Sequence, residues 1–116
     1  MGKRAKTGAV GGTVIVMTAT DSRRRAAAMA RRAVRERLAA CVQTFPVTST
    51  YRWKGRFETA KEFLLLMKTQ AARSAMLVDS IRRWHTYELP EILVVPVQGG
   101  LEGYIAWIRR LTSLKA

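Results

Sequence analysis

The sequence predicts a small α+β domain in which helices alternate with the strands of one sheet. Runs of β-branched and aliphatic residues at 13–20, 63–69 and 91–97 are typical of buried strands. Between these runs, one segment after Ser22 and another over 71–84 carry apolar residues at helical spacing. The chain has 116 residues, which is the length of one ordinary domain.

The first strand is expected at 13–20, and the residues before it, 1–12, are expected to form a flexible basic tail. Residues 13–116 would then make up a single domain. Asp21 or Ser22 is suited to cap the N-terminus of the helix that follows, because a short polar side chain accepts a bond from the first turn. The apolar stripe of that helix is expected to consist of Ala27, Ala30, Val34 and Leu38.

A long β-hairpin is expected in the middle of the chain. Lys54-Gly55 lies between two β-prone arms and predicts a tight turn, in which the glycine supplies a positive φ. Counting outward from this turn places Cys41 opposite Lys68. Pro46 lacks a ladder donor, so it predicts either an edge strand or a bulge that would shift this register.

The remaining elements complete a recognisable order. A second helix is expected at 71–84 and a strand at 91–97, and a final helix is expected at about 101–112, after a Gly99-Gly100 turn. The order is strand, helix, strand, strand, helix, strand, helix. Its first six elements match the ferredoxin-like arrangement, in which the helices lie on one face of a four-stranded antiparallel sheet. The apolar sides of the two helices are expected to be Leu77, Val78, Ile81 and Trp84, and Leu101, Tyr104, Ile105, Ile108 and Leu111.

Two features predict an oligomer. The strands at 14–17, 63–67 and 92–95 are apolar on consecutive residues, so both faces of the sheet require burial. Because the helices cover only one face, a partner subunit is expected to cover the other. Hairpin arms of about 14 residues would also extend over about 46 Å, far beyond the radius of gyration of about 13 Å for such a domain. The hairpin should therefore reach a neighbouring subunit.

The chain is strongly basic, with 21 lysines and arginines against 8 acidic residues and a net charge of +13. Such a chain attracts polyanions nonspecifically. The charges are spread along the sequence, which favours a solvated surface over a dedicated nucleic-acid site. Arg23, Arg24 and Arg25 occupy the first turn of a helix, where the dipole disfavours cations, so local propensity does not explain them.

The single cysteine, Cys41, excludes an intramolecular disulfide, and together with one histidine it cannot form a four-ligand zinc site. A free thiol suits a reducing compartment, so a cytoplasmic location is expected. Lys3, Arg4 and Lys6 precede an apolar stretch as in a signal peptide, but glycines interrupt that stretch and no cleavage site follows. No apolar run approaches the roughly 20 residues that span a bilayer, so no membrane association is expected.

Four segments together resemble the CutA family, the divalent-cation tolerance proteins. They are ERLAACV at 36–42, YRWKG at 51–55, FLLLMKT at 63–69 and HTYELPEI at 85–92. Each falls on the expected element, and the four stand in the expected order. The resemblance spans about residues 13 to 112.

The resemblance implies a ferredoxin-like homotrimer, similar to PII-type signalling proteins, whose hairpins wrap neighbouring subunits. It implies an intersubunit cleft and a role in tolerance of copper or another divalent metal; no organic cofactor is indicated. Thr86 replaces the proline that usually follows the histidine, which would loosen that loop, and the first helix begins with arginines where the family usually has glutamates. Matched by position, the cleft residues are Cys41, Trp53, Lys68, His85, Tyr87 and Glu91.

The candidate metal or ligand cleft therefore comprises Cys41, Lys68, His85, Tyr87 and Glu91. A lysine ammonium beside a thiol favours the thiolate, and a thiolate with an imidazole suits Cu(I), Cu(II) or Zn(II). Structural roles are the alternatives. A lone cysteine often fills a core, a histidine at a helix end can cap carbonyl groups, and Glu91 can pair with an arginine.

The hairpin residues Tyr51, Trp53, Lys54 and Gly55 are expected to anchor an interface. No catalytic residue is predicted, because the chain has neither a glycine-rich phosphate loop nor a nucleophile elbow. Three other functions stay open: a basic ferredoxin-like nucleic-acid-binding module, a structural or signalling trimer that acts through a protein partner, and a small acid–base enzyme. That enzyme would use Lys68, His85 and Glu91. The expected central strands at 14–17 and 63–67 have almost none of the aromatic residues with which related RNA-binding sheets stack bases.

Overall fold

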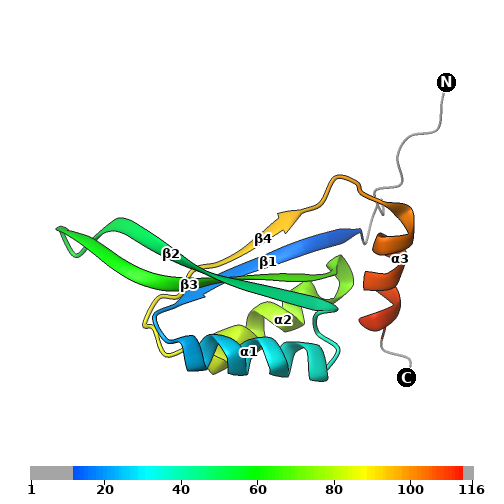
Figure 1. Cartoon of the computed structure of the whole chain (residues 1–116), viewed down its shortest axis with the longest axis horizontal. Coiled ribbons are helices and arrows are strands. Elements are labelled where there is room, and N and C mark those ends of the chain that lie inside the picture. Colours follow the sequence, from blue (N-terminus) through cyan, green and yellow to red (C-terminus); the bar gives the residue numbers. More distant parts are fainter. Residues whose placement is uncertain (1–11, 114–116) are drawn as a thin grey trace.

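The computed structural model describes residues 12–113, and its elements follow the predicted order (Figure 1). The residues expected to form the basic tail lie outside this range, apart from Gly12. The elements are β1 (Thr13–Thr20), α1 (Arg23–Arg35), β2 (Cys41–Trp53), β3 (Arg56–Gln70), α2 (Ala71–Trp84), β4 (Ile92–Pro96) and α3 (Glu102–Leu111).

The strands form one antiparallel sheet in the order β2-β3-β1-β4. Helices α1 and α2 lie side by side on one face of this sheet, and α3 stands at the end of the sheet where β1 begins (Figure 1). This is the predicted ferredoxin-like arrangement with an added C-terminal helix. No helix within residues 12–113 has the length and apolar character needed to cross a membrane.

The hairpin has the predicted turn and register. Lys54 and Gly55 have φ values of +52° and +78°, as a two-residue turn with both central residues in the left-handed region requires. The ladder runs without interruption from Trp53 opposite Arg56 to Cys41 opposite Lys68. Pro46 therefore makes no bulge; it lies on β2, an edge strand of the sheet, where a missing donor is tolerated.

The hairpin also extends beyond the rest of the domain, as predicted. The pairing between β3 and β1 ends at Phe63, so 56–62 of β3 are paired with β2 alone. The chain measures 52 × 35 × 21 Å, and the projecting hairpin is visible at one end of the molecule (Figure 1). A two-stranded ribbon of this kind is only marginally stable by itself.

The predicted apolar stripe of α1 is wrong by about one position. The buried residues of the helix are Ala26, Met29 and Ala33, whereas Ala27 is exposed and Val34 is 42% exposed. Three consecutive alanines leave the inward side ambiguous in the sequence. The large side chain of Met29 decides it, because Met29 fills the core together with its neighbours three positions before and four after. Leu38 is buried but lies after the helix ends, and Leu101, expected on the apolar side of α3, is 79% exposed.

Arginines link the two antiparallel helices end to end. Arg25, in the first turn of α1, donates from Nη1 to the carbonyl of Trp84 at the end of α2, at 3.3 Å. Arg73, in the first turn of α2, donates from Nε and Nη2 to the carbonyl of Arg37, at 3.4 and 3.1 Å. Arg37 follows α1 and has a φ of +61°. A cation at the start of one helix thus satisfies carbonyl groups at the end of the other.

The face of the sheet opposite α1 and α2 is apolar and largely uncovered. Strand alternation puts Val14, Val16, Leu65 and Met67 in the core against the helices. The other face carries half-buried residues in the central strands and exposed ones toward the edges, with Leu93 at 54% and Phe45 at 42%. Its apolar residues are Ile15, Met17, Phe45, Leu64, Leu66, Leu93 and Val95, and together they are called the open face below.

The Arg73 contact gives a testable prediction for stability. Arg73→Ala should lower the free energy of unfolding by about 2–3 kcal/mol, because the buried Arg73 side chain is removed and the Arg37 carbonyl loses its charged donor. Arg82→Ala is the matched control, because Arg82 is exposed and should change stability by no more than about 0.5 kcal/mol. Urea unfolding at equal protein concentrations measures both. Equal losses in the two variants would contradict a specific capping role.

Candidate functional site

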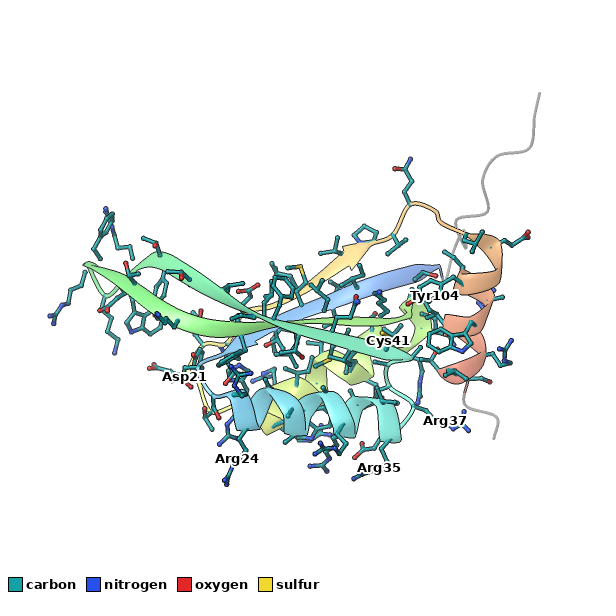
Figure 2. The ribbon with its side chains drawn as sticks, viewed as in Figure 1. Asp21, Arg24, Arg35, Arg37, Cys41 and Tyr104 are labelled. Atoms are coloured by element: carbon teal, nitrogen blue, oxygen red, sulfur yellow. The ribbon has the colours of Figure 1, made fainter. Side chains whose placement is uncertain are left out.

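A groove of about 720 Å³ opens where the hairpin leaves the sheet. Its walls come from the end of β1, from the projecting strands of the hairpin over 49–53 and 60–62, and from the loop that follows α2. Figure 2 places Asp21, one of the lining residues, at this end of the molecule. The lining residues are Ala19, Asp21, Ser49, Thr50, Tyr51, Trp53, Ala60, Glu62, Tyr87, Glu88, Leu89 and Glu91.

The charge of this groove is opposite to that of the whole chain. Asp21, Glu62, Glu88 and Glu91 line it, which is half of the 8 acidic residues in the sequence. None of the 21 lysines and arginines is among its lining residues in the described part of the chain. Concave walls and like charges concentrate a negative potential, so this groove favours cationic groups.

Within the groove, a tyrosine hydroxyl donates a hydrogen bond to a buried carboxylate. Glu62 is only 8% exposed, and the hydroxyl of Tyr87 donates to its Oε2 at 2.7 Å. Burial raises the pKa of the Tyr87 phenol, and the hydrogen bond to Glu62 and the negative charges of Glu62 and Asp21 raise it further. Tyr87 therefore stays protonated and keeps its hydrogen bond to the carboxylate far into the alkaline range.

His85 connects the loop that follows α2, which also carries Tyr87, to the end of β1 through a hydrogen bond. Its Nε2 lies 2.7 Å from the carbonyl oxygen of Ala19, and its Nδ1 accepts from the backbone N–H of Tyr87 at 3.1 Å. A carbonyl can only accept, so Nε2 carries the proton and the ring is the neutral tautomer. Both nitrogens are used within the chain, which leaves no lone pair for a metal ion in this arrangement. The carbonyl that it caps belongs to β1 and not to the preceding helix.

Cys41 and Lys68 form a separate group at the other end of the sheet, next to α3 (Figure 2). The predicted pairing of these two residues is confirmed. The Lys68 ammonium donates to the hydroxyl of Tyr104 at 3.3 Å and lies 5.4 Å from the centre of that ring. Tyr104 in turn stacks on Trp107. Cys41 is a free, half-buried thiol and is not part of the hydrophobic core.

In the folded chain, the candidate cleft residues therefore lie in two separate groups. Lys68 lies opposite Ile15, whereas His85 contacts Ala19, four residues further along β1, or about 13 Å away. Tyr87 and Glu91 line the groove. Among residues 12–113, no three His, Cys, Asp or Glu side chains lie close enough together to hold a metal ion.

The four hairpin residues that were predicted to anchor an interface also lie in two places. Lys54 and Gly55 form the turn, while Tyr51 and Trp53, predicted as interface anchors, line the groove. Sequence reasoning missed three carboxylates of the groove, namely Asp21, Glu62 and Glu88. A signal for Glu62 was present, because strand alternation puts it on the same face as Leu64 and Leu66, where a charge needs a partner. No comparable local signal existed for Asp21 or Glu88.

The tyrosine–glutamate pair predicts a distinctive pH dependence. Tyr87→Phe should cost about 1–3 kcal/mol at neutral pH, because buried Glu62 loses its donor. The pKa of Tyr87 is raised in the folded chain, so its contribution is complete below the ordinary value of 10.0 and decreases as the pH rises above it. The gap in unfolding free energy between the natural chain and the variant should thus narrow above about pH 10.

Urea unfolding from pH 7 to pH 11.5 measures this gap. Tyr51→Phe serves as the control, since Tyr51 lines the same groove but is 44% exposed. A gap for Tyr87→Phe that stays constant over the whole range would contradict the assigned pair.

Comparison with known proteins adds independent information. The family described as "CutA1 divalent ion tolerance protein" matches residues 14–111. Protein CutA of Homo sapiens is 42% identical over 86 residues, which cover 73% of this chain and 48% of that protein. The divalent-cation tolerance protein CutA of Thermus thermophilus is 37% identical over 100 residues, which cover 85% of this chain and 97% of the relative. The chain thus spans about half the length of the human relative and nearly all of the bacterial one.

Solved structures agree with the sequence comparison. The structure of the periplasmic divalent cation tolerance protein CutA from Archaeoglobus fulgidus superposes with a TM-score of 0.85 at 31% identity, over 87% of this chain and 99% of that one. The Thermus thermophilus structure gives a TM-score of 0.84 at 36% identity, again over 87% of this chain and 99% of the other. The fold, the register and these matches lead to one conclusion: the chain belongs to the CutA1 divalent ion tolerance family.

Proposed function

We propose that the chain acts in divalent-cation tolerance as a cytoplasmic homotrimer that binds copper or another divalent ion between its subunits, without catalysis. The observation that carries this proposal is the open face, an apolar surface with one group of candidate ligands at each end. The family name supports the link to divalent cations. The free thiol of Cys41 supports a reducing compartment.

The open face supports the assembly. Its central residues are only half-buried, and its edge residue Leu93 is 54% exposed. Contiguous apolar surfaces of this kind are typical of subunit interfaces. The overhanging hairpin supplies a second contact, because 56–62 of β3 pair only with β2 and lie beyond the sheet that supports the rest of the strand. Strand β4 has a free edge for a neighbouring hairpin to approach.

A closed ring would join the two groups of candidate ligands. In a head-to-tail ring, one end of a subunit contacts the opposite end of its neighbour. The Cys41 end of one open face would then meet the acidic groove of the next subunit. Such a cleft combines a soft thiolate with carboxylates, including Glu91, and a thiolate suits copper better than it suits magnesium or calcium. His85 would position the loop without binding the ion, because both its nitrogens are engaged.

The assembly is tested by one substitution on the open face. Light scattering of the natural chain should give three times the 13.0 kDa of one subunit. Leu93→Asp should shift the mass toward one subunit, because a carboxylate would be buried at the interface. Val34→Asp is the control, since Val34 is 42% exposed on the outer side of α1 and its change should leave the trimer intact. A monomeric natural chain at micromolar concentration would overturn the proposed assembly.

The metal site is tested by calorimetric titration of the reduced protein with copper. Saturable binding should be weakened at least about tenfold by Cys41→Ser and by Glu91→Gln, since each removes a ligand from the cleft. Leu93→Asp should also abolish it, because the proposed site exists only between subunits. Glu102→Gln, an exposed carboxylate on α3, should have no effect. Binding that is indifferent to Cys41→Ser would overturn the site without affecting the assembly.

A further inference from the structure

A row of arginines runs along the outer side of α1, away from the open face. Arg24, Arg31 and Arg35 lie within about 40° of one another around the helix, since each residue advances the helix by about 100°. The buried residues of α1 point to the opposite side, toward the sheet. Figure 2 shows Arg24 and Arg35 directed away from the sheet into solvent. Arg24, Arg31 and Arg35 are called the arginine stripe below.

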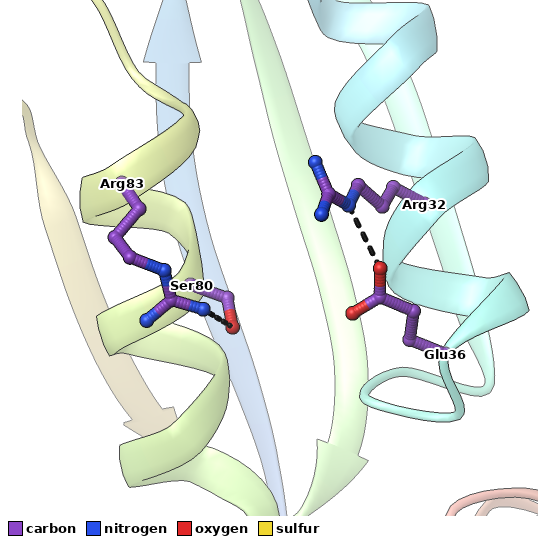
Figure 3. Close-up of polar contacts among 4 residues, drawn as sticks. All are labelled: Arg32, Glu36, Ser80 and Arg83. Atoms are coloured by element: carbon purple, nitrogen blue, oxygen red, sulfur yellow. Dashed lines mark hydrogen bonds and ion pairs between the residues drawn. The ribbon is translucent and has the colours of Figure 1, made fainter.

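Most other arginines of the helix layer have structural roles. Arg23 lies over the ring of Phe63 at 4.8 Å, and Arg25 caps the end of α2. Arg32 pairs with Glu36 at 2.7 Å and Arg83 donates to the hydroxyl of Ser80 (Figure 3). Arg83 also pairs with Asp79. Contacts within the fold are therefore enough to explain these four side chains.

The arginine stripe has no such explanation. None of its three side chains forms an ion pair, a hydrogen bond or a ring contact with any residue of the described range 12–113. Helix α1 contains no acidic residue, although it contains six arginines, and Arg24 stands in the first turn, where the dipole opposes a cation. Like charges four residues apart, as at Arg31 and Arg35, also repel. Arg35 lies in the last turn, where the dipole favours a cation, but no contact inside the fold offsets the cost of Arg24 or the repulsion between Arg31 and Arg35. This uncompensated cost indicates a partner outside the fold.

The chemistry of the arginine stripe favours phosphate over a membrane surface. The guanidinium group donates two parallel hydrogen bonds to one phosphate. A helix that lies in a membrane interface also buries large apolar side chains in the lipid. On α1 the only exposed large hydrophobic residue is Val34, at 42%, and the remaining apolar residues either are alanines or pack against the sheet.

We propose that the arginine stripe binds the phosphate backbone of double-stranded nucleic acid without reading its sequence. Arg24 and Arg35 are about 16 Å apart along the helix, a length over which a duplex carries about ten phosphates. The exposed side of α1 offers arginines, alanines and one valine, and no asparagine or glutamine that would read base edges, so contacts with the backbone phosphates are favoured. This surface is on the other side of the sheet from the proposed metal cleft, and the two bind independently.

The test measures the affinity of the full-length protein for a fluorescent 20-base-pair DNA duplex across a range of salt concentrations. Arg24→Gln, Arg31→Gln and Arg35→Gln together should weaken binding at least about tenfold and lower the slope of log affinity against log salt by about 2 to 3. The control variant carries Lys61→Gln, Arg82→Gln and Arg110→Gln at exposed positions on three other elements, which remove the same net charge. It should retain most of the affinity.

Three results would overturn the proposal. Equal losses in both triple variants would mean that net charge alone attracts the duplex. An unchanged affinity in the helix variant would place binding elsewhere. Binding of vesicles that contain phosphatidylserine, lost in the helix variant while the natural chain ignores the duplex, would assign the arginine stripe to membranes. Circular dichroism and thermal midpoints should be unaltered in both variants, because none of the replaced side chains forms a hydrogen bond, an ion pair or a ring contact within residues 12–113.

Discussion

The tight turn at Lys54-Gly55 fixes the register on which the rest of the structure depends. Two residues with positive φ leave one way to pair the arms, and the pairing then continues unbroken to Cys41 and Lys68. Strand β3 carries this register inward, because its second half also pairs with β1. A shift of one residue would turn Leu65 and Met67 away from the helices and put Leu64 and Leu66 in the core instead. The two faces of the sheet, and hence the core and the open face, follow from this turn.

Charge is divided between the two sides of the molecule. Half of the carboxylates gather in the groove beside the projecting hairpin, while the outer side of the helix layer is rich in arginine. Glu62 is tolerated in its buried position because Tyr87 donates to it. The groove thus presents negative charge and the arginine stripe positive charge, and the two surfaces lie on opposite sides of the sheet.

The loop after α2 shows how a short segment is held without regular structure. His85 donates to β1 and accepts from the backbone of Tyr87, while Tyr87 donates to β3. The two rings also contact each other, with centres 4.6 Å apart. Thr86 stands between them, so the loop is held on both sides of this residue. The histidine therefore acts on the groove by positioning the tyrosine.

Local patterns in the sequence were enough to predict the order of the elements, the hairpin turn, the pairing of Cys41 with Lys68 and the apolar character of both sheet faces. These depend on neighbours in the chain: on φ at Gly55, on strand alternation and on β-branched runs. The inward side of α1 was not determined, because three adjacent alanines are equivalent until Met29 meets the core. Only part of the groove lining was predicted from the sequence. Tyr87 and Glu91 were predicted, but Asp21, Glu62 and Glu88 come from separate elements, and only the folded chain brings them together. The separation of His85 from Cys41 also appears only in the folded chain. It arises because His85 adjoins the end of β1 at Ala19, whereas Cys41 pairs with Lys68 near the start of β1.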